Sequence, residues 1–391
     1  MVMTDLELID ADGHILEPPE MWLEYIEPKY RDQAPRLADY QGRELWMVED
    51  HPLIRGAADG GGRGLAGAAG KNLAEILEKD SGYRDNPPAA FDPHERIKTL
   101  DSERIRRAVL YPTMALFVNA GRVKDPALVT AACRAYNDWM ADYCRPYPDR
   151  LYGAAAIPLH DIPAAIAELK RSVTTLGLRS AFIRPTPHQG ERPFNDPVYD
   201  PFWSALQDLD VPLSLHPAVG EELPGASQRF HLYGEDPATR TPGMGVSFSQ
   251  GLGNPIDMIV SLGWFIFGGV LERFPRLKVI ILESGGGWIQ PILERMDHHA
   301  HVFTFEVKHL SLLPTEYFRR QMWISFDPDE MLLKATAELV GSDRIVWASD
   351  FPHPDAKWPG CGNEVRENLE ALPLEDQRLI AGQNAVDLYR L

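Results

Sequence analysis

Asp12 and His14 are the first residues in the chain whose types and spacing could support metal chemistry. They lie at the end of the run 6–14, which begins with apolar residues and carries Asp10, Asp12 and His14 at alternate positions. Side chains at i and i+2 of a β-strand point to the same face, so these three would project together. A carboxylate and an imidazole on one face form half of a divalent metal site. Gly13 would let another group approach the backbone closely. The alternative is a turn followed by a helix cap.

Further along the chain, ionisable residues stand directly after short apolar runs, at Arg184, His216, Glu283 and Asp350. Stability alone does not require such positions, because a buried charge costs several kcal/mol unless it is paired. A shared divalent cation would remove that cost and leave positions open for water and substrate. We therefore predict one metal ion with four ligands, namely Asp12, His14, His216 and Asp350.

Residues at the same strand ends are predicted to have further roles. Asp350 is also a candidate catalytic base, and Glu283 is either a fifth ligand or a catalytic acid or base. Arg184 is expected to bind a substrate carboxylate. His353 is expected to contact the substrate and to support the ligands rather than bind the metal. Each has a structural alternative: a turn residue at Asp350, a cap of the glycine-rich turn at Glu283, an ion pair with a structural acid at Arg184, and a buried core histidine at His216.

Two other groups of residues are less directly linked to chemistry. Five aromatic residues near the expected mouth suggest a flat or hydrophobic substrate, although core packing explains them at least as well: Trp22, Phe230, Trp288, Phe351 and Trp358. Of these, Trp288 and Phe351 are the predicted substrate contacts. Three histidines late in a predicted helix are expected to be solvated at the helix end, where the dipole favours positive charge: His298, His299 and His301.

The elements that must position these residues alternate along the chain. Asp92 and Pro93 begin a helix as its N-cap and first residue, and from there apolar runs alternate with helical patterns. There are eight such runs in all, namely 6–10, 108–111, 151–157, 181–183, 212–215, 279–282, 322–325 and 345–348. Helical patterns include 125–145, 163–176, 197–209, 256–274 and 287–303. This alternation predicts parallel strands buried on both faces. Eight units close into an α/β barrel of the (β/α)8 (TIM) type, and an open doubly wound sheet is the alternative.

The predicted organisation is a single domain over residues 1–391, with insertions after strand 1 (15–90) and strand 5 (217–255). The second insertion would complete the pocket or a subunit contact. Within the first, residues 36–50 predict a hairpin. The glycine-rich stretch 55–71 predicts a mobile loop that does not pack against a core, either a lid over an active site or a disordered insertion. It contains a Gly-x-Gly-x-x-Gly pattern, but no strand precedes it and no helix follows directly, so nucleotide binding is rejected.

Composition narrows the class of protein. Apolar residues make up 44% of the 391 residues, yet no run approaches the ~18 consecutive apolar residues of a membrane span, and no signal peptide is visible. The three cysteines show no metal-type spacing, and buried free thiols in a reducing, cytoplasmic setting are expected. A net charge of −18 argues against nucleic acid and anionic membranes as partners. We therefore expect the partner of this protein to be a small-molecule substrate.

Four segments, 10–14, 215–217, 282–288 and 348–353, carry a likeness to a known family. With them the chain resembles the amidohydrolase-related family that includes aminocarboxymuconate semialdehyde decarboxylase and the dihydroxybenzoate and hydroxyisophthalate decarboxylases. The resemblance implies a (β/α)8 barrel, one divalent metal at its mouth and often a homodimer. It places the first ligand pair of the family on Asp12 and His14, the mid-chain histidine on His216 and the late aspartate on Asp350. The chain has Glu283-Ser284 where the family has a catalytic histidine before the glycines.

The residue types allow more than one metal ion and more than one reaction. The extra carboxylate favours a hard ion such as Mn²⁺ or Mg²⁺, with zinc and iron as alternatives. The first hypothesis is non-oxidative decarboxylation of a small aromatic or unsaturated carboxylic acid. The second is hydrolysis of a C–N, C–O or C–C bond by a metal-activated water. The third is a binding protein without catalysis on a degenerate barrel.

Overall fold

The computed structural model describes residues 6–40, 42–54, 64–79, 81–118, 123, 125–187, 192–218 and 246–391. Phe230, residues 55–63 of the glycine-rich stretch and residues 219–245 of the second insertion lie outside the described residues. No described helix is long and apolar enough to cross a membrane.

Eight parallel strands form the central sheet, in the spatial order in which they occur along the chain. They are β1 (Leu8–His14), β5 (Ile105–Tyr111), β6 (Leu151–Ala156), β7 (Ser180–Ile183), β8 (Leu213–Leu215), β9 (Val279–Ile281), β10 (Met322–Phe326) and β11 (Ile345–Trp347). Apart from two residues of β5, every strand residue is buried, as expected for strands covered on both faces. The eight predicted apolar runs are therefore confirmed as the strands of a (β/α)8 barrel.

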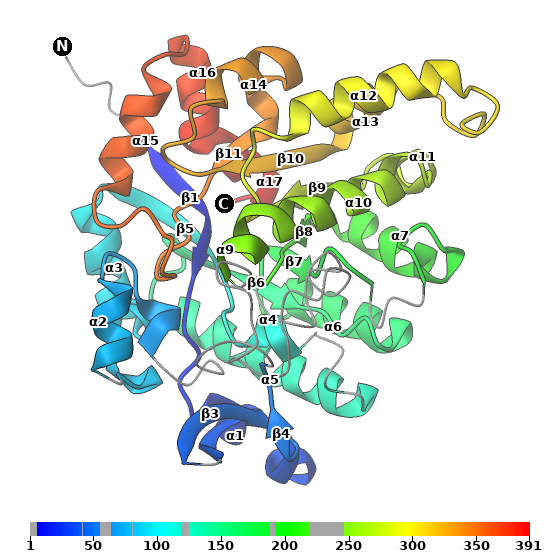
Figure 1. Ribbon diagram of the computed structural model, residues 1–391. Coiled ribbons are helices and arrows are strands. Elements are labelled where there is room, and N and C mark those ends of the chain that lie inside the picture. The colour runs from blue at the N-terminus through cyan, green and yellow to red at the C-terminus, as the bar shows by residue number, and fades with distance from the viewer. Residues whose placement is uncertain are drawn as a thin grey trace.

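Helices surround the barrel (Figure 1). The longer ones are α3 (Pro93–Ser102), α5 (Pro126–Cys144), α6 (Ile162–Thr174), α7 (Asp200–Leu209), α10 (Asn254–Ile266), α12 (Ile289–Val302), α13 (Pro314–Gln321), α14 (Leu333–Val340) and α15 (Cys361–Leu369). The shorter ones are α1 (Met21–Tyr25), α2 (Leu73–Glu78), α4 (Ala115–Val118), α9 (Val246–Phe248), α11 (Val270–Arg273), α16 (Leu374–Arg378) and α17 (Asn384–Tyr389). The predicted cap is present, since Asp92 accepts hydrogen bonds from the amides of His94 and Glu95. The pattern 256–274 forms two helices, α10 and α11, and Gly269 with φ +74° is the N-cap of the second.

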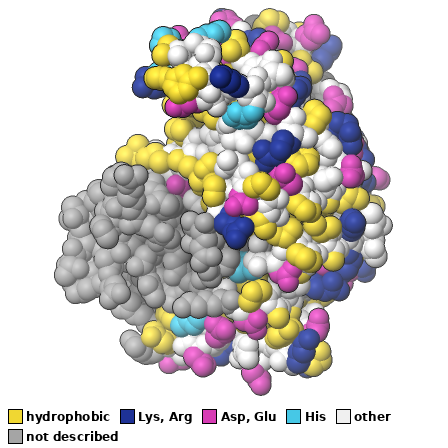
Figure 2. Space-filling model, turned by 90° about the vertical axis from the view of Figure 1, so that its right-hand side faces the viewer, with side chains coloured by type: hydrophobic (Ala, Val, Ile, Leu, Met, Phe, Trp, Pro, Cys, Tyr) yellow, Lys and Arg dark blue, Asp and Glu magenta, His cyan; other side chains and the backbone are white. Residues whose placement is uncertain are grey.

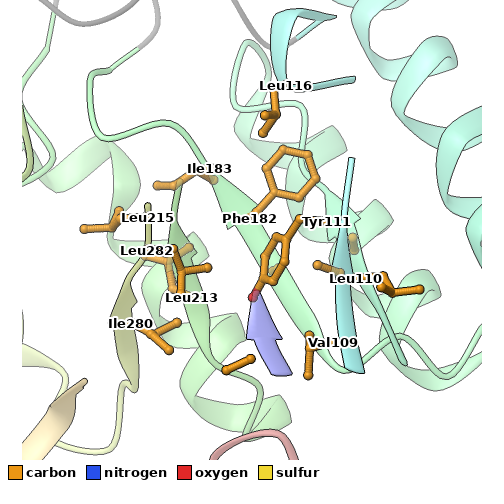
Figure 3. Packing of buried hydrophobic residues seen from close by; sticks show 14 of the residues in the cluster. Val109, Leu110, Tyr111, Leu116, Phe182, Ile183, Leu213, Leu215, Ile280 and Leu282 are labelled. Carbon is orange, nitrogen blue, oxygen red and sulfur yellow. The ribbon is translucent and has the colours of Figure 1, made fainter. Parts of the chain in front are cut away.

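Large side chains fill the barrel interior. Figure 3 shows Tyr111 and Phe182 lying in the space between the strands, and their rings lie 6.4 Å apart. The Tyr111 hydroxyl lies 2.7 Å from Oγ of Ser214. The interior is therefore a packed core, and chemistry is confined to the strand ends.

The insertion after β1 contains the predicted hairpin. Strands β2 (Arg36–Tyr40) and β3 (Arg43–Val48) pair antiparallel, and β4 (His51–Pro52) adds a third strand. In the glycine-rich stretch, Gly64–Gly67 forms a 3-10 helix and Ala68 is fully buried. The expectation that this stretch would not pack against a core is therefore wrong for its described part.

The outer helical surface carries charges of both signs. Figure 2 shows Lys and Arg side chains interspersed with Asp and Glu on the face that it presents. Near the C-terminal end of α12, His298, His299 and His301 are solvent-accessible, and His299 Nδ1 lies 2.9 Å from the carbonyl oxygen of Arg295. These histidines are at a solvated helix end, as predicted.

All three cysteines are free and buried, as expected: Cys133, Cys144 and Cys361.

Candidate metal centre and active site

Two strands of the barrel bring Asp12, His14 and His216 together. Asp12 and His14 close β1, and His216 follows β8 directly. The Nε2 atoms of His14 and His216 are 3.0 Å apart, and Oδ1 of Asp12 lies 3.5 Å from each of them. All three side chains are at most 1% exposed. Their donor atoms therefore lie close enough together to bind a single ion.

The ends of β9 and β11 add two carboxylates to this group. Oδ1 of Asp350 lies 3.5 Å from Nε2 of His14, and Oε2 of Glu283 lies 3.4 Å from Nε2 of His216. Both acidic residues have a positive φ, 55° at Asp350 and 43° at Glu283. Residues with side chains rarely adopt this conformation, and such strain is concentrated at functional sites. The donor atoms thus form two groups that share His14, one of Asp12, His14 and His216 and the other of His14, Glu283, Asp350 and His353.

Second hydrogen bonds fix the orientation of both histidine rings. Nδ1 of His14 lies 2.8 Å from the carbonyl oxygen of Pro112, and Nδ1 of His216 lies 2.7 Å from that of Pro217. Because a carbonyl only accepts, we assign the hydrogen of each neutral ring to Nδ1. Each Nε2 then presents a lone pair towards the other ring. This is the arrangement by which metal-binding histidines are normally held.

The electrostatics of the site show an excess of buried negative groups. Burial, followed by repulsion from Asp355 and Asp12, raises the pKa of Asp350 well above its usual range. Burial and the charge of Asp350 raise the pKa of Glu283 to about 8. Burial lowers the pKa of the His216 ring, but the charges of Asp12 and Glu283, the contact with Asp12 and the hydrogen bond to Pro217 together outweigh burial, so the net shift is upward.

The His14 ring shows the opposite shift. Burial lowers its pKa well below the usual value, and His353 and His216 lower it further. A neutral His14 keeps its Nε2 lone pair available.

Unpartnered buried atoms test whether a metal ion fits this site. Among the described residues, both carboxylate oxygens of Asp12 and Oε2 of Glu283 are buried without a hydrogen-bond partner. Buried polar atoms normally have partners, so each such exception needs a cause. A divalent cation would satisfy these oxygens and separate the facing lone pairs of the two imidazoles. The residues present therefore fit one divalent ion with mixed nitrogen and oxygen donors.

His353 lies between Asp350 and Thr113 and contacts both side chains. Its Nδ1 lies 2.7 Å from Oδ1 of Asp350, and its Nε2 lies 3.0 Å from Oγ1 of Thr113. The Thr113 hydroxyl donates to the carbonyl of Ile15 at 2.8 Å, so it accepts from the ring of His353. The His353 ring also packs 4.0 Å from that of His14, measured between centroids. The supporting role of His353 stays a prediction, since its ring nitrogen is also grouped with His14, Glu283 and Asp350 as a possible metal donor.

The other predicted substrate contacts differ in their surroundings. Arg184 follows β7, whose Ile183 pairs with Leu215 of β8, so it lies one strand from His216 and is 7% exposed. Trp288 is partly buried, and its indole donates to the carbonyl of Ser284 at 3.1 Å. The buried ring of Phe351 packs against Trp358, with centroids 4.4 Å apart, and under the guanidinium of Arg96. Its contact with a substrate stays a prediction.

The glycine-rich turn after Glu283 has a structural explanation. The amides of Gly286 and Gly287 donate to the carboxylate of Glu330. A Cβ atom on Gly286 would lie 1.9 Å from the ring of Phe326. These glycines thus permit close packing before α12. Beside the turn, Glu283 Oε1 accepts a hydrogen bond from Gln250 at 3.1 Å.

A cavity of about 240 Å³ adjoins this group of residues. Its lining includes Asp12, Gln250, Glu283, Asp350 and Asp355. Neither Gln250 nor Asp355 was predicted as a site residue. No motif or strand end distinguishes them in the sequence.

The barrel and the ionisable residues at its strand ends define the class of metal-dependent barrel enzymes whose active sites lie at the carboxyl ends of the strands. A comparison with family models then identifies the family. The amidohydrolase model matches residues 9–391, and the chain belongs to that family.

Two curated relatives match most of the chain. A gamma-resorcylate decarboxylase of Rhodococcus jostii is 28% identical over 339 residues, covering 82% of this chain and 96% of the relative. A 2-amino-3-carboxymuconate-6-semialdehyde decarboxylase of Dictyostelium discoideum is 24% identical over 387 residues, covering 98% and 91%. Both are named as decarboxylases of the kind on which the sequence resemblance was based.

Two solved structures share the fold over nearly their whole length. An amidohydrolase of Mycobacterium avium subsp. paratuberculosis has a TM-score of 0.79 at 21% identity, with 98% of each chain covered. A dihydroxybenzoic acid decarboxylase of Polaromonas, solved with manganese and the inhibitor 2-nitroresorcinol, has a TM-score of 0.64 at 18% identity, covering 99% of this chain and 97% of that one.

Proposed function

We propose that this chain catalyses the metal-dependent, non-oxidative decarboxylation of a small aromatic or unsaturated carboxylic acid. The observation that carries the proposal is the convergence of two imidazole Nε2 atoms with the carboxylates of Asp12 and Asp350 at one end of the barrel. The decarboxylase relatives support the reaction type. The proposed ion is Mn²⁺, because a donor set rich in carboxylates suits a hard cation.

Asp12, His14, His216 and Asp350 would hold this ion. When bound, a divalent cation would bind substrate oxygens and stabilise the negative charge that develops as CO2 leaves. Arg184, one strand from His216, would bind the carboxylate that is lost. Trp288 remains a proposed contact for the flat part of the substrate.

Carboxyl groups of this chain would supply the proton that replaces CO2 on the substrate. The bond between the substrate carbon and its carboxylate breaks, and the electron pair stays on that carbon. A proton from Glu283 or Asp350 then replaces CO2, and water later returns a proton to the carboxylate. Glu283 is well placed because Gln250 fixes one of its oxygens, while the other is buried beside His216. His353 holds Asp350 in position through the 2.7 Å contact.

Product analysis tests this function. The protein loaded with Mn²⁺ is incubated with 2,6-dihydroxybenzoate and related hydroxylated or unsaturated acids, in D2O and separately in ¹⁸O-labelled water. The expected result is one CO2 for each product molecule, with one deuterium at the carbon that lost the carboxylate and no ¹⁸O in the organic product. The Asp350→Asn variant is the inactive control.

Hydrolysis is the second candidate, and the position of Glu283 favours it. A carboxylate 3.4 Å from His216, where the resembling decarboxylases have a histidine, could accept a proton from an attacking water. This reaction would transfer ¹⁸O from water to the organic product and release no CO2. That outcome would replace the decarboxylase proposal.

A further inference from the structure

We infer that Arg96, Asp10 and Ser349 are positioning residues. They hold the first barrel strand, β1, against the last, β11, and thereby set the geometry of the metal centre. The inference rests on the metal centre proposed above. It concerns residues that touch none of the reacting atoms. None of the three was predicted as a site residue, although Asp10 was expected beside Asp12.

The seam between β11 and β1 is joined differently from the other strand pairs. Ladders of strand pairing join each neighbouring pair from β1 to β11, but no ladder joins β11 back to β1, both strands being fully described. Just beyond β11, two backbone hydrogen bonds cross the seam, from the amide of Asp350 to the carbonyl of Asp12 at 3.1 Å and from the amide of His14 to the carbonyl of Phe351 at 2.8 Å. Asp12 and His14 come from β1, and Asp350 follows β11. The distance between these ligands therefore depends on these two bonds and on the side chains that reinforce them.

The Asp10 carboxylate bridges the seam from inside. Its Oδ1 accepts the amide of Ser349 at 3.0 Å, and its Oδ2 accepts the Ser349 hydroxyl at 2.6 Å. The Ser349 hydroxyl oxygen in turn accepts the amide of Phe351 at 3.1 Å. Asp10 is fully buried and Ser349 is 2% exposed. These bonds fix the chain on both sides of Asp350, where its positive φ would otherwise be costly.

The Arg96 guanidinium bridges the seam from the direction of α3. Nη1 donates to the carbonyl of His14 at 2.8 Å, and Nη2 donates to the carbonyl of Phe351 at 3.2 Å. The same Phe351 carbonyl accepts the amide of His14 at 2.8 Å. One side chain thus holds one metal ligand and the neighbour of another. A planar fork with several donors suits such a two-point contact better than an ammonium group.

Gly13 makes room for this bridge. A Cβ atom at Gly13 would lie 2.7 Å both from Nη2 of Arg96 and from Oδ2 of Asp10. The two charged groups therefore approach the backbone between Asp12 and His14 as closely as a glycine allows. This is the close approach that the sequence predicted at Gly13, and the approaching groups are protein side chains. Arg96 is fully buried, where a charge is maintained only for a specific contact.

Metal affinity measured separately from stability tests the inference. Binding of Mn²⁺ to the full chain is followed by the EPR signal of the free ion, and thermal unfolding is measured without metal. Arg96→Met and Ser349→Ala should each weaken Mn²⁺ binding by about ten- to a hundredfold, the usual cost of losing a group that supports metal ligands. Ser349→Ala decides the question if Arg96→Met does not fold.

Asn384→Ala is the matched control. Asn384 is buried and donates to two backbone carbonyls, as Arg96 does, but at Ser342 and Ile345, by the amino end of β11. It should lower the unfolding temperature and leave the affinity for Mn²⁺ unchanged. If wild type binds Mn²⁺ and both seam variants bind it equally tightly, the inference alone is overturned. If wild type binds no Mn²⁺, the metal centre is wrong and the inference falls with it.

Discussion

Replacing Asp12 with asparagine should remove most of the stability that a metal ion gives this protein. Asp12→Asn keeps the shape of the side chain and removes its negative charge. In wild type, both oxygens of the Asp12 carboxylate are buried without hydrogen-bond partners among the described residues. Loss of a group that merely supports a ligand costs about ten- to a hundredfold in metal affinity. Loss of a ligand carboxylate should therefore cost at least about a hundredfold.

This change in affinity converts into a shift in unfolding temperature. With Mn²⁺ at about a hundred times the Kd of wild type, binding stabilises wild type by about 2.7 kcal/mol, and a hundredfold weaker variant gains only about 0.4 kcal/mol. For 391 residues the unfolding entropy near the midpoint is about 0.8 kcal/mol per degree. Mn²⁺ should therefore raise the Tm of wild type by about 3 °C and that of Asp12→Asn by about 0.5 °C.

Scanning calorimetry with EDTA and with Mn²⁺ measures both shifts. The control is Asp125→Ala, which removes the N-cap of α5 and should lower the Tm by a similar amount in both buffers, at a cost of about 0.5–2 kcal/mol. Its gain from Mn²⁺ should equal that of wild type. An equal gain in Asp12→Asn would refute the assignment of Asp12 as a ligand.

Two further predictions concern buried carboxyl groups. Glu283→Gln should lower kcat by about 10²–10⁴-fold with Mn²⁺ affinity within a few-fold of wild type; full activity would exclude Glu283 as the proton donor. Burial raises the pKa of Glu17 from 4.5 to about 7, so the folded state binds this proton more tightly than the unfolded state. The stability contributed below pH 4.5 is then lost as the pH rises through about 7. Relative to Glu17→Gln, wild type should lose about 3 kcal/mol between pH 4.5 and about pH 8, measured by denaturant unfolding, and a constant difference would contradict this.

The strands and their terminal residues were predictable because their signals are local. A parallel strand covered on both faces is a short, nearly continuous apolar run, and an ionisable residue directly after such a run stands out. This was enough to predict the barrel and to bring His216 and Glu283, 67 positions apart in the chain, into one site. The Asp92 cap is local in the same sense.

The supporting residues depend on contacts that no local pattern records. Arg96 lies on α3, and the sequence of this helix predicts only where the helix begins. The function inferred for Arg96 follows from the way α3 packs against the seam. A charged residue on the otherwise apolar face of α3, beside the buried Ile97 and Leu100, was the one available signal. The packing of Phe351 against Trp358 and Arg96 was likewise not predictable, because both partners are brought to it by the tertiary fold.

An anomalous-difference map at the manganese absorption edge, from crystals grown with Mn²⁺, tests the central claim most directly. The account predicts one peak in the described part of the barrel mouth, within coordination distance of Nε2 of His14, Nε2 of His216 and the carboxylates of Asp12 and Asp350. A peak elsewhere, such as at the solvated histidines at the end of α12, with none among these four side chains, would contradict it.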